Sequence, residues 1–186
     1  VQSCLELELE KLYRKLFMPA ARQSTAGARK RYAGVVYGSD TTEFVGMEVV
    51  RRDWTELAKD VQRGLFDRLF AGNPVEDFLI ESVKDVREGK LDRKLVYRKG
   101  VRKDLASYKR NTPPHVVAAR KSSEATRVIA YMITVAGPEP LSDLRHEPDR
   151  EHYVQAQIRA VSEPVLGALG LNFDRVIGDD KQLGLF

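Results

Sequence analysis

Basic side chains that could bind phosphate groups are bunched along this 186-residue sequence rather than spread evenly. The formal net charge is only +4, so the argument depends on clustering, which concentrates positive potential locally. Any single bunch is equally well explained as a solvated face balanced by nearby carboxylates, whereas three bunches together favour a polyanionic partner. The clustered residues are Arg29, Lys30, Arg31, Arg51, Arg52, Arg98, Lys99, Arg102, Lys103, Lys109 and Arg110.

The first bunch belongs to a run over residues 29–34 (RKRYAG) that combines cations with an aromatic ring. Alternate side chains of a β-strand point to the same face, so the run predicts Lys30 and Tyr32 on one side. A lysine beside a tyrosine can contact a phosphodiester and a sugar or base edge without reading the sequence of a nucleic acid. The alternative is an edge strand whose cations form salt bridges.

A second chemical signal is the apolar sequence QLGLF at residues 182–186, which follows a polar stretch. An extended tail of this kind could bury Leu185 and Phe186 in a partner's apolar pocket while the Gln182 amide makes a hydrogen bond. The alternative is that Leu183, Leu185 and Phe186 fold back as a docked chain end.

Signals of independent catalysis are missing from the sequence. It has no glycine-rich phosphate loop, no nucleophile elbow and no paired-histidine metal helix. His115, His146 and His152 are scattered, His115 beside two prolines is typical of a structural residue, and Cys4 is the only cysteine, so no metal site or disulfide is expected. No apolar run approaches the roughly 18 residues of a membrane span, which predicts a globular cytoplasmic protein.

The elements that would position these groups begin with period-two alternation. Leucines alternate with glutamates over residues 5–10, which predicts a strand with one solvated face. Alternating stretches over residues 30–37 and 44–50 flank the turn at 38–40 and predict a β-hairpin.

Helical periodicity replaces alternation from Trp54, where apolar residues recur every three or four positions until Gly72. Asp53 suits the N-cap of this helix. The sequence at 73–76 (NPVE) then supplies an N-cap side chain, a proline for the first helical position and a capping-box acid. It predicts a second helix that ends near Gly89.

The second half of the sequence is more broken. Residues 95–120 predict short segments whose basic residues lie on loops and helix ends, with a short helix after the prolines at 113–114. Residues 127–135 predict a strand, which the sequence GPEP at 137–140 breaks before a long loop. Apolar spacing over 153–166 predicts a last helix, so the whole order is that of an α+β protein.

With Arg29 in place of its first lysine, the basic run resembles the Lys-Lys-Arg-Tyr primer-binding motif at the end of the palm domain in family B DNA polymerases. Residues 46–54 (GMEVVRRDW) are similar to the segment that leads these enzymes from palm into thumb. Residues 95–99, 113–116 and 137–140 look like the thumb of the bacterial DNA polymerase II group. The resemblance covers essentially the whole chain, although arginine keeps only the charge of the replaced lysine and changes its geometry.

The resemblance implies three parts. Residues 1–50 would form the end of a palm with a short antiparallel sheet, residues 51–177 a mainly helical thumb with a small β element, and residues 178–186 a flexible tail. The end of this tail resembles the pentapeptide that binds the bacterial sliding clamp. The residues given the clamp-binding role are Gln182, Leu183, Leu185 and Phe186.

For DNA, the resemblance implies phosphate contacts that hold primer–template without reading its sequence, so binding should weaken with salt. The metal-binding aspartates and the exonuclease domain of the family lie upstream, so this chain is expected to be inactive alone and to carry no cofactor, whereas its parent would use Mg²⁺ and dNTPs. The expected DNA-binding residues are Arg29, Lys30, Arg31, Tyr32, Arg51, Arg52, Arg98, Lys99, Arg102 and Lys103, the last four on charge alone.

The expected partners are primer–template DNA, the sliding clamp and the remainder of a polymerase chain, in replication and repair synthesis at the nucleoid. The alternative is a stand-alone accessory module that binds DNA and docks on the clamp. The sequence opens on Val1 rather than a methionine, which argues weakly for a piece of a longer polypeptide. A long reading frame upstream that contains metal-binding aspartates would favour the piece over the accessory module.

Overall fold

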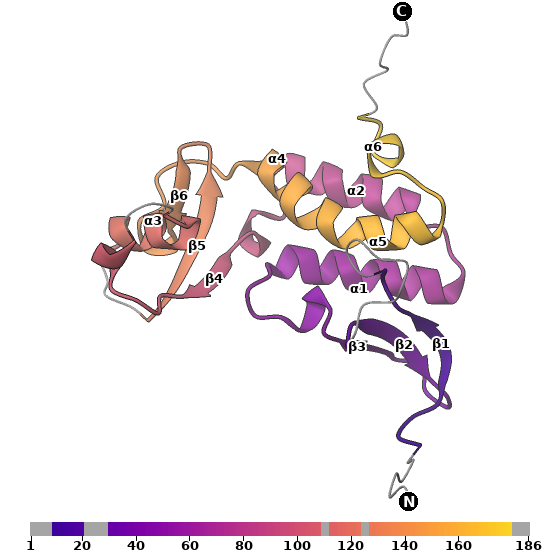
Figure 1. The fold of residues 1–186 in the computed structure, drawn as a ribbon. Helices are drawn as coiled ribbons and strands as arrows, with labels where there is room; N and C mark the ends of the chain where they lie inside the picture. The colour runs from indigo at the N-terminus through magenta and orange to yellow at the C-terminus, as the bar shows by residue number, and fades with distance from the viewer. Residues whose placement is uncertain (1–8, 21–29, 109–111, 124–126, 180–186) are drawn as a thin grey trace, which may run out of the picture. The chain divides into compact units, whose positions relative to one another are not determined.

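The chain divides into two compact units, Val1–Met47 and Glu48–Phe186 (Figure 1). In this computed structural model each unit holds a three-stranded antiparallel sheet, and the second unit also holds the helices. The predicted α+β class is therefore confirmed. The part of the chain that the structure describes comprises residues 9–20, 30–108, 112–123 and 127–179.

The sheet of the first unit has the order β1-β2-β3, with β1 at Tyr13–Phe17, β2 at Tyr32–Val36 and β3 at Thr42–Val45. The predicted hairpin is confirmed as the antiparallel pair β2 and β3. Its second strand was predicted too long, because residues 48–50 form a 3₁₀ turn instead. The strand predicted over residues 5–10 lies mostly outside the described residues, and its described end at 9–10 is not in a strand.

The central strand β2 is the buried part of this sheet. Ala33 and Val35 are 0% and 4% exposed, so the period-two pattern holds a small core. A Cβ on Gly34 would lie 2.7 Å from the Tyr13 ring, so a glycine lets that ring cross the strand. The Tyr13 hydroxyl then donates a hydrogen bond of 2.8 Å to Glu43 Oε2, which ties β1 to β3 across β2.

In the second unit, α1 (Glu56–Ala71) and α2 (Glu76–Arg87) agree with the two predicted helices. Gly72 ends α1 in a left-handed conformation (φ 77°), as a helix C-terminal glycine does. The predicted N-caps are wrong. Thr55, not Asp53, caps α1, since its Oγ1 accepts a hydrogen bond from the Ala58 N–H at 3.2 Å.

The start of α2 also differs from the prediction based on Asn73. Its N-cap residue is Val75, which has no side chain that could cap. The Glu76 carboxylate accepts a hydrogen bond from the Val75 N–H at 2.9 Å and supplies the missing acceptor. The acid of the predicted capping box therefore bonds to the N–H of Val75, two positions from the Asn73 N–H that was expected.

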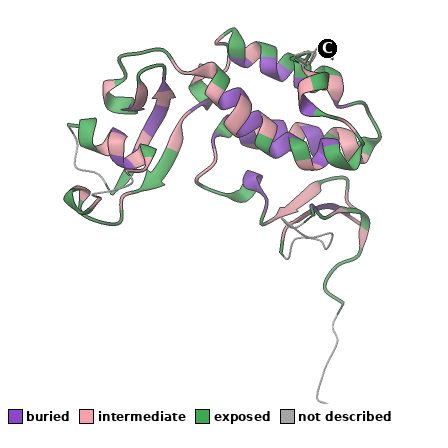
Figure 2. Cartoon of the chain, turned by 45° about the horizontal axis from the view of Figure 1, so that its top comes forward, coloured by how far each residue is buried: buried purple, intermediate pink, exposed green. Residues whose placement is uncertain are grey.

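A third helical segment packs against α1 and α2 (Figure 1). The predicted last helix is confirmed but is irregular, because a π-helical stretch at 154–159 joins α4 (Arg150–Tyr153) to α5 (Ala160–Ala168). A short helix α6 (Phe173–Val176) follows. Residues of these helices form one buried core cluster, and Figure 2 marks the buried positions in purple. None of the helices in the described ranges is long and apolar enough to cross a membrane.

The small sheet of this unit has the order β4-β5-β6 and is covered by α3. The predicted strand at 127–135 and the predicted helix after Pro113 are confirmed. The strand ends before GPEP, as predicted, but GPEP does not open the expected loop: it forms the edge strand β6, where a proline needs no N–H on the open side. The bounds are β4 Tyr97–Gly100, α3 Pro114–Lys121, β5 Val128–Thr134 and β6 Gly137–Pro140.

Three stacked tyrosines connect this sheet to the helices. The Tyr97 ring on β4 lies between Tyr131 on β5 and Tyr153 on α4, with ring centroids 5.3 Å and 5.5 Å away. The Tyr97 hydroxyl also lies 3.1 Å from His152 Nε2. Because Tyr97 is held from both sides, the following residues of β4 have a fixed position relative to the helices.

Candidate functional site

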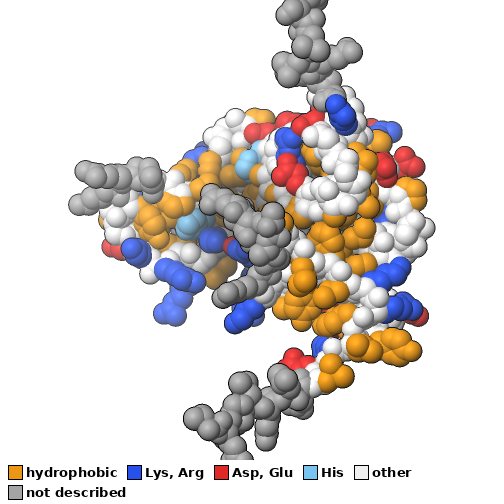
Figure 3. Space-filling view, turned by 45° about the vertical axis from the view of Figure 1, so that its right-hand side comes forward, with side chains coloured by type: hydrophobic (Ala, Val, Ile, Leu, Met, Phe, Trp, Pro, Cys, Tyr) orange, Lys and Arg blue, Asp and Glu red, His pale blue; other side chains and the backbone are white. Residues whose placement is uncertain are grey.

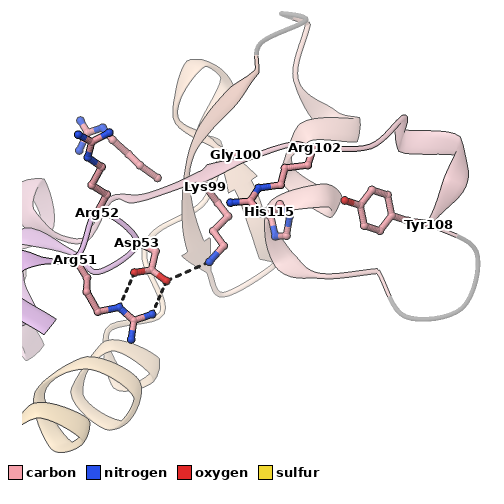
Figure 4. A pocket seen from close by; sticks show the side chains of 9 residues that line it. Arg51, Arg52, Asp53, Lys99, Gly100, Arg102, Tyr108 and His115 are labelled. Carbon is pink, nitrogen blue, oxygen red and sulfur yellow. Dashed lines mark hydrogen bonds and ion pairs between the residues drawn. The ribbon is translucent and has the colours of Figure 1, made fainter. Parts of the chain in front are cut away.

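A hollow of about 680 Å³ in the second unit is lined by five cationic side chains and one carboxylate (Figure 4). Its lining comes from three stretches: the residues just before α1, the strand β4 with the loop after it, and the start of α3. We call it the basic hollow. It is lined by Arg51, Arg52, Asp53, Arg98, Lys99, Gly100, Arg102, Tyr108 and His115.

Asp53 lies at the centre of the hydrogen bonds in the basic hollow (Figure 4). Arg51 donates two parallel bonds to it, from Nε to Oδ1 at 3.1 Å and from Nη2 to Oδ2 at 3.0 Å. Lys99 donates a third from Nζ to Oδ2 at 3.2 Å. The Arg51 guanidinium, and after it the Lys99 ammonium, lowers the pKa of the Asp53 carboxyl, so Asp53 is a carboxylate at neutral pH.

The other three cations of the basic hollow are not neutralised by any residue that the structure describes. Arg52, Arg98 and Arg102 are exposed, and no acidic side chain in the described part of the chain pairs with them. Figure 3 shows Lys and Arg side chains grouped toward the lower left of the face in view, beside a histidine. A concave surface with several unneutralised guanidinium groups attracts polyanions and can bind phosphates with two hydrogen bonds each.

The stretch that carries Arg51 to Asp53 is anchored at both ends by buried polar contacts. Before it, the Gln62 side chain on α1 donates to Glu48 Oε2 and accepts from the Val49 N–H, both at 2.8 Å. After it, Thr55 Oγ1 donates to Gln157 Oε1 at 2.8 Å. Buried, satisfied polar groups fix geometry because breaking any one leaves another without a partner.

His115 and Tyr108 add rings rather than charge to the basic hollow. Burial first, and the Lys99 charge second, lowers the pKa of His115, so its imidazole is neutral at neutral pH. The hollow therefore presents cationic groups beside two rings that can form hydrogen bonds or stack on a base or sugar.

The structure shows the basic run of the first unit in a different geometry from the predicted one. Lys30 is not in a strand: it lies in a turn with φ 58°, and β2 begins only at Tyr32, so alternation cannot place the two on one face. The turn requires Gly46 (φ 62°), because a Cβ there would clash with the Lys30 carbonyl oxygen. Arg31 is half-buried, and Arg29 lies outside the described residues.

Five predicted DNA-binding residues therefore come together in the basic hollow: Arg51, Arg52, Arg98, Lys99 and Arg102. Arg98 and Lys99 lie on β4 and not, as predicted, on loops or helix ends. Lys103 is exposed but does not line the hollow, and Lys30, Arg31 and Tyr32 belong to the first unit.

Sequence reasoning did not assign Asp53, Tyr108 or His115 to a site. An Arg-x-Asp spacing was a usable local signal for the pair of Arg51 and Asp53. The contact between Asp53 and Lys99 joins positions 46 apart in sequence, so no local pattern could have revealed it.

The predicted clamp-binding residues, Gln182, Leu183, Leu185 and Phe186, lie outside the described residues. The two described residues of the predicted tail are Gly178 and Asp179. Arg87 on α2 forms an ion pair with Asp179 and another with Glu151 at 3.1 Å. Asp179 is therefore tied to α2, whereas the predicted tail would require it to be free.

Comparison with known proteins covers residues of both units. Residues 1–159 match the profile described as DNA polymerase family B. The chain is 39% identical over 198 residues to DNA polymerase II of Escherichia coli (strain K12), an alignment that covers 99% of this chain and 25% of that protein. It is 32% identical to a DNA polymerase of Desulfurococcus sp. (strain Tok), with 89% of this chain and 23% of that protein covered.

The fold is similar to that of a solved structure, the family B DNA polymerase from the hyperthermophilic archaeon Pyrobaculum calidifontis. The TM-score is 0.66 at 23% sequence identity, over 89% of this chain and 23% of that chain. The present chain thus spans about a quarter of the length of the relatives that it matches.

Proposed function

The chain belongs to DNA polymerase family B, and from this premise we propose that it is the C-terminal part of a DNA-directed DNA polymerase and holds primer–template DNA. In this proposal residues 1–50 end the palm and residues 51–177 form the thumb. The parent enzyme acts in replication and repair synthesis at the nucleoid, and this part contributes grip rather than chemistry.

The observation that carries the proposal is the basic hollow, in which the fold brings together five cations from stretches that are far apart in the sequence. Phosphodiester groups are the ligands that such a surface fits, because guanidinium groups bind them in a bidentate geometry. Contacts of this kind fix the position of a duplex without reading its bases. Lys30 and Tyr32 would add contacts to the primer from the first unit.

The test is binding of the 186-residue chain to a fluorescent primer–template duplex, measured by anisotropy over a series of salt concentrations. Arg98→Ala removes one unpaired cation and should weaken binding at all sequences while lowering the slope of log K against log salt by about 1. Arg93→Ala is the matched control, because Arg93 is exposed, lies in the same unit and does not line the hollow. Equal effects of the two substitutions, or binding that does not respond to salt, would refute the proposal.

We also propose that QLGLF at residues 182–186 docks on a bacterial sliding clamp, through Gln182, Leu183, Leu185 and Phe186. The support is the sequence alone: two large apolar side chains and an amide can fill a pocket with one fixed hydrogen bond. Binding of the chain to a clamp should disappear when these five residues are deleted. Binding that survives the deletion would refute this proposal and favour the alternative in which Leu185 and Phe186 fold back on the protein.

The two-metal chemistry expected of the parent enzyme requires carboxylates that hold Mg²⁺. In the part of the chain that the structure describes, no three His, Cys, Asp or Glu side chains are grouped closely enough to hold a metal ion. We therefore expect that this chain alone neither extends nor digests a primer. Extension of a primer by the purified chain with dNTPs and Mg²⁺ would contradict that expectation.

A further inference from the structure

Asp53 stands out because it places a negative charge in the middle of a surface that otherwise attracts phosphate. If positive charge alone mattered, the surface would attract phosphate more strongly without this carboxylate. The same arginine–carboxylate fork occurs elsewhere in this unit, where Arg145 donates to Asp143 at 3.0 Å and 2.8 Å. Unlike the fork of Asp143, the fork of Asp53 also receives a bond from Lys99 on β4.

The contacts of Asp53 leave most donors of both cations available. A guanidinium carries five N–H groups, of which the fork of Arg51 uses two. An ammonium carries three, of which Lys99 uses one. The two side chains are thus held close to one another while their remaining donors can still reach a ligand.

We propose that Asp53 is a positioning residue, which holds Arg51 and Lys99 so that their free donors converge on one phosphate of the DNA. This inference rests on the proposed function of the basic hollow. A long cationic side chain that must be ordered on binding weakens affinity by roughly two- to tenfold. Holding two such side chains in advance outweighs the repulsion from one partly exposed carboxylate, which water and salt screen.

Replacement Asp53→Asn separates positioning from charge because the two ideas predict opposite signs. Removing the carboxylate makes the hollow more positive, so charge alone predicts tighter DNA binding and a steeper salt dependence. Positioning predicts binding weaker by roughly three- to tenfold, because an amide cannot accept the two-bond fork as a carboxylate does. The measurement is anisotropy with the full chain and primer–template duplex at near-physiological salt.

A double-mutant cycle gives a readout that a purely structural role would not move. Arg51→Ala should weaken binding less in the Asp53→Asn background than in the wild-type chain, because the lost partner no longer holds Arg51 in place. Arg98→Ala should have the same effect in both backgrounds, since Arg98 does not contact Asp53. Asp143→Asn, which breaks the matched fork outside the hollow, should leave affinity unchanged.

Unchanged or tighter binding by Asp53→Asn, with the effect of Arg98→Ala intact, would overturn the inference and leave the proposed function standing. Loss of any effect of Arg98→Ala would overturn both. If circular dichroism shows that Asp53→Asn unfolds the chain, Arg51→Lys replaces it, since lysine keeps the charge and cannot form the fork. Positioning predicts weaker binding for Arg51→Lys, and wild-type affinity there would refute it.

Discussion

Two hollows in the second unit use the same kinds of residue for different ends. The basic hollow combines arginine, lysine, histidine and a carboxylate, and so does a smaller hollow of about 390 Å³ around Glu139, which we call the Glu139 hollow. In the basic hollow Asp53 is partly exposed and the cations outnumber it. In the other, Glu139 is only 4% exposed and accepts from the Arg145 N–H at 2.9 Å and the His146 N–H at 3.1 Å.

The two hollows differ in whether their cations are bonded to other groups of the protein. In the Glu139 hollow the polar groups bind one another: His146 Nδ1 lies 2.6 Å from Glu139 Oε1, Lys121 donates to the Pro138 carbonyl at 2.9 Å, and Arg145 forms its fork with Asp143. These contacts hold the loop that follows β6 in place. In the basic hollow three arginines have no acidic partner among the described residues, so unpaired cations, and not residue types, distinguish a binding surface from a structural one.

The largest effect should come from removing those unpaired cations together. The substitutions Arg52→Ala, Arg98→Ala and Arg102→Ala in one chain should weaken DNA binding by roughly a hundredfold or more and lower the salt slope by about 3, since each phosphate contact contributes about 0.9. Affinity and slope follow from anisotropy with primer–template duplex. The three side chains have no acidic partner among the described residues, so thermal stability should change little.

The matched control removes cations of the other hollow. Lys121→Ala with Arg145→Ala takes charge from the same unit, but from cations that are bonded to the protein and do not line the basic hollow. We expect less than a threefold change in DNA affinity, as screening at this distance leaves only a weak long-range attraction. A loss as large as that of the triple variant would show that total charge, not the basic hollow, governs binding.

Local rules predicted most of the elements. Helical periodicity located α1 and α2, and β-branched composition located β5, because these patterns depend on one buried face. The rules failed where a residue's partner lies far along the chain. Thr55 caps α1 in a network with Gln157, 102 positions away, and no local feature favours it over Asp53.

The same limit applies to the candidate site. Clustering identified Arg51, Arg52, Arg98, Lys99 and Arg102 as candidate phosphate-binding residues, and all five line the basic hollow. Clustering could not say which cations would be held by a carboxylate and which left free, since that depends on how β4 packs beside the stretch before α1. The prolines of GPEP likewise predicted a loop where β6 forms, because an edge strand tolerates prolines that a central strand would exclude.

The next effect concerns the Glu139 hollow and should appear in stability alone. Glu139→Gln keeps one oxygen that can accept from the N–H groups of Arg145 and His146, but that oxygen is neutral and accepts more weakly than a carboxylate. Loss of the charge from these buried hydrogen bonds should lower the free energy of unfolding by roughly 1–3 kcal/mol at pH 7, measured by urea denaturation. DNA affinity should stay within twofold, and a clear loss of affinity would join the two hollows into one functional surface.

The pH dependence of that difference has a definite sign. Hydrogen bonds from the Arg145 N–H, and then from His146, lower the pKa of Glu139 to about 2 from an ordinary value of 4.5. A depressed folded-state pKa contributes stability that is fully present above the unfolded value and is lost as the pH falls through the folded value. The difference between the wild-type chain and Glu139→Gln should therefore be constant from pH 7 to about 5 and shrink toward pH 2. A difference that grows on acidification would contradict this assignment.

The smallest effect is expected from His115, which lines the basic hollow without contributing charge. Because burial and the nearby Lys99 lower its pKa, His115 should become charged only at a lower pH than an ordinary histidine. DNA affinity should then change by less than about twofold as the pH falls from 7.5 to 6.5, and His115→Gln should follow the wild-type chain. Tighter binding near pH 6.5 that is absent in His115→Gln would mean that a protonated His115 adds a sixth cation to the hollow. The comparison between free and internally used groups would then extend to a group whose charge depends on pH.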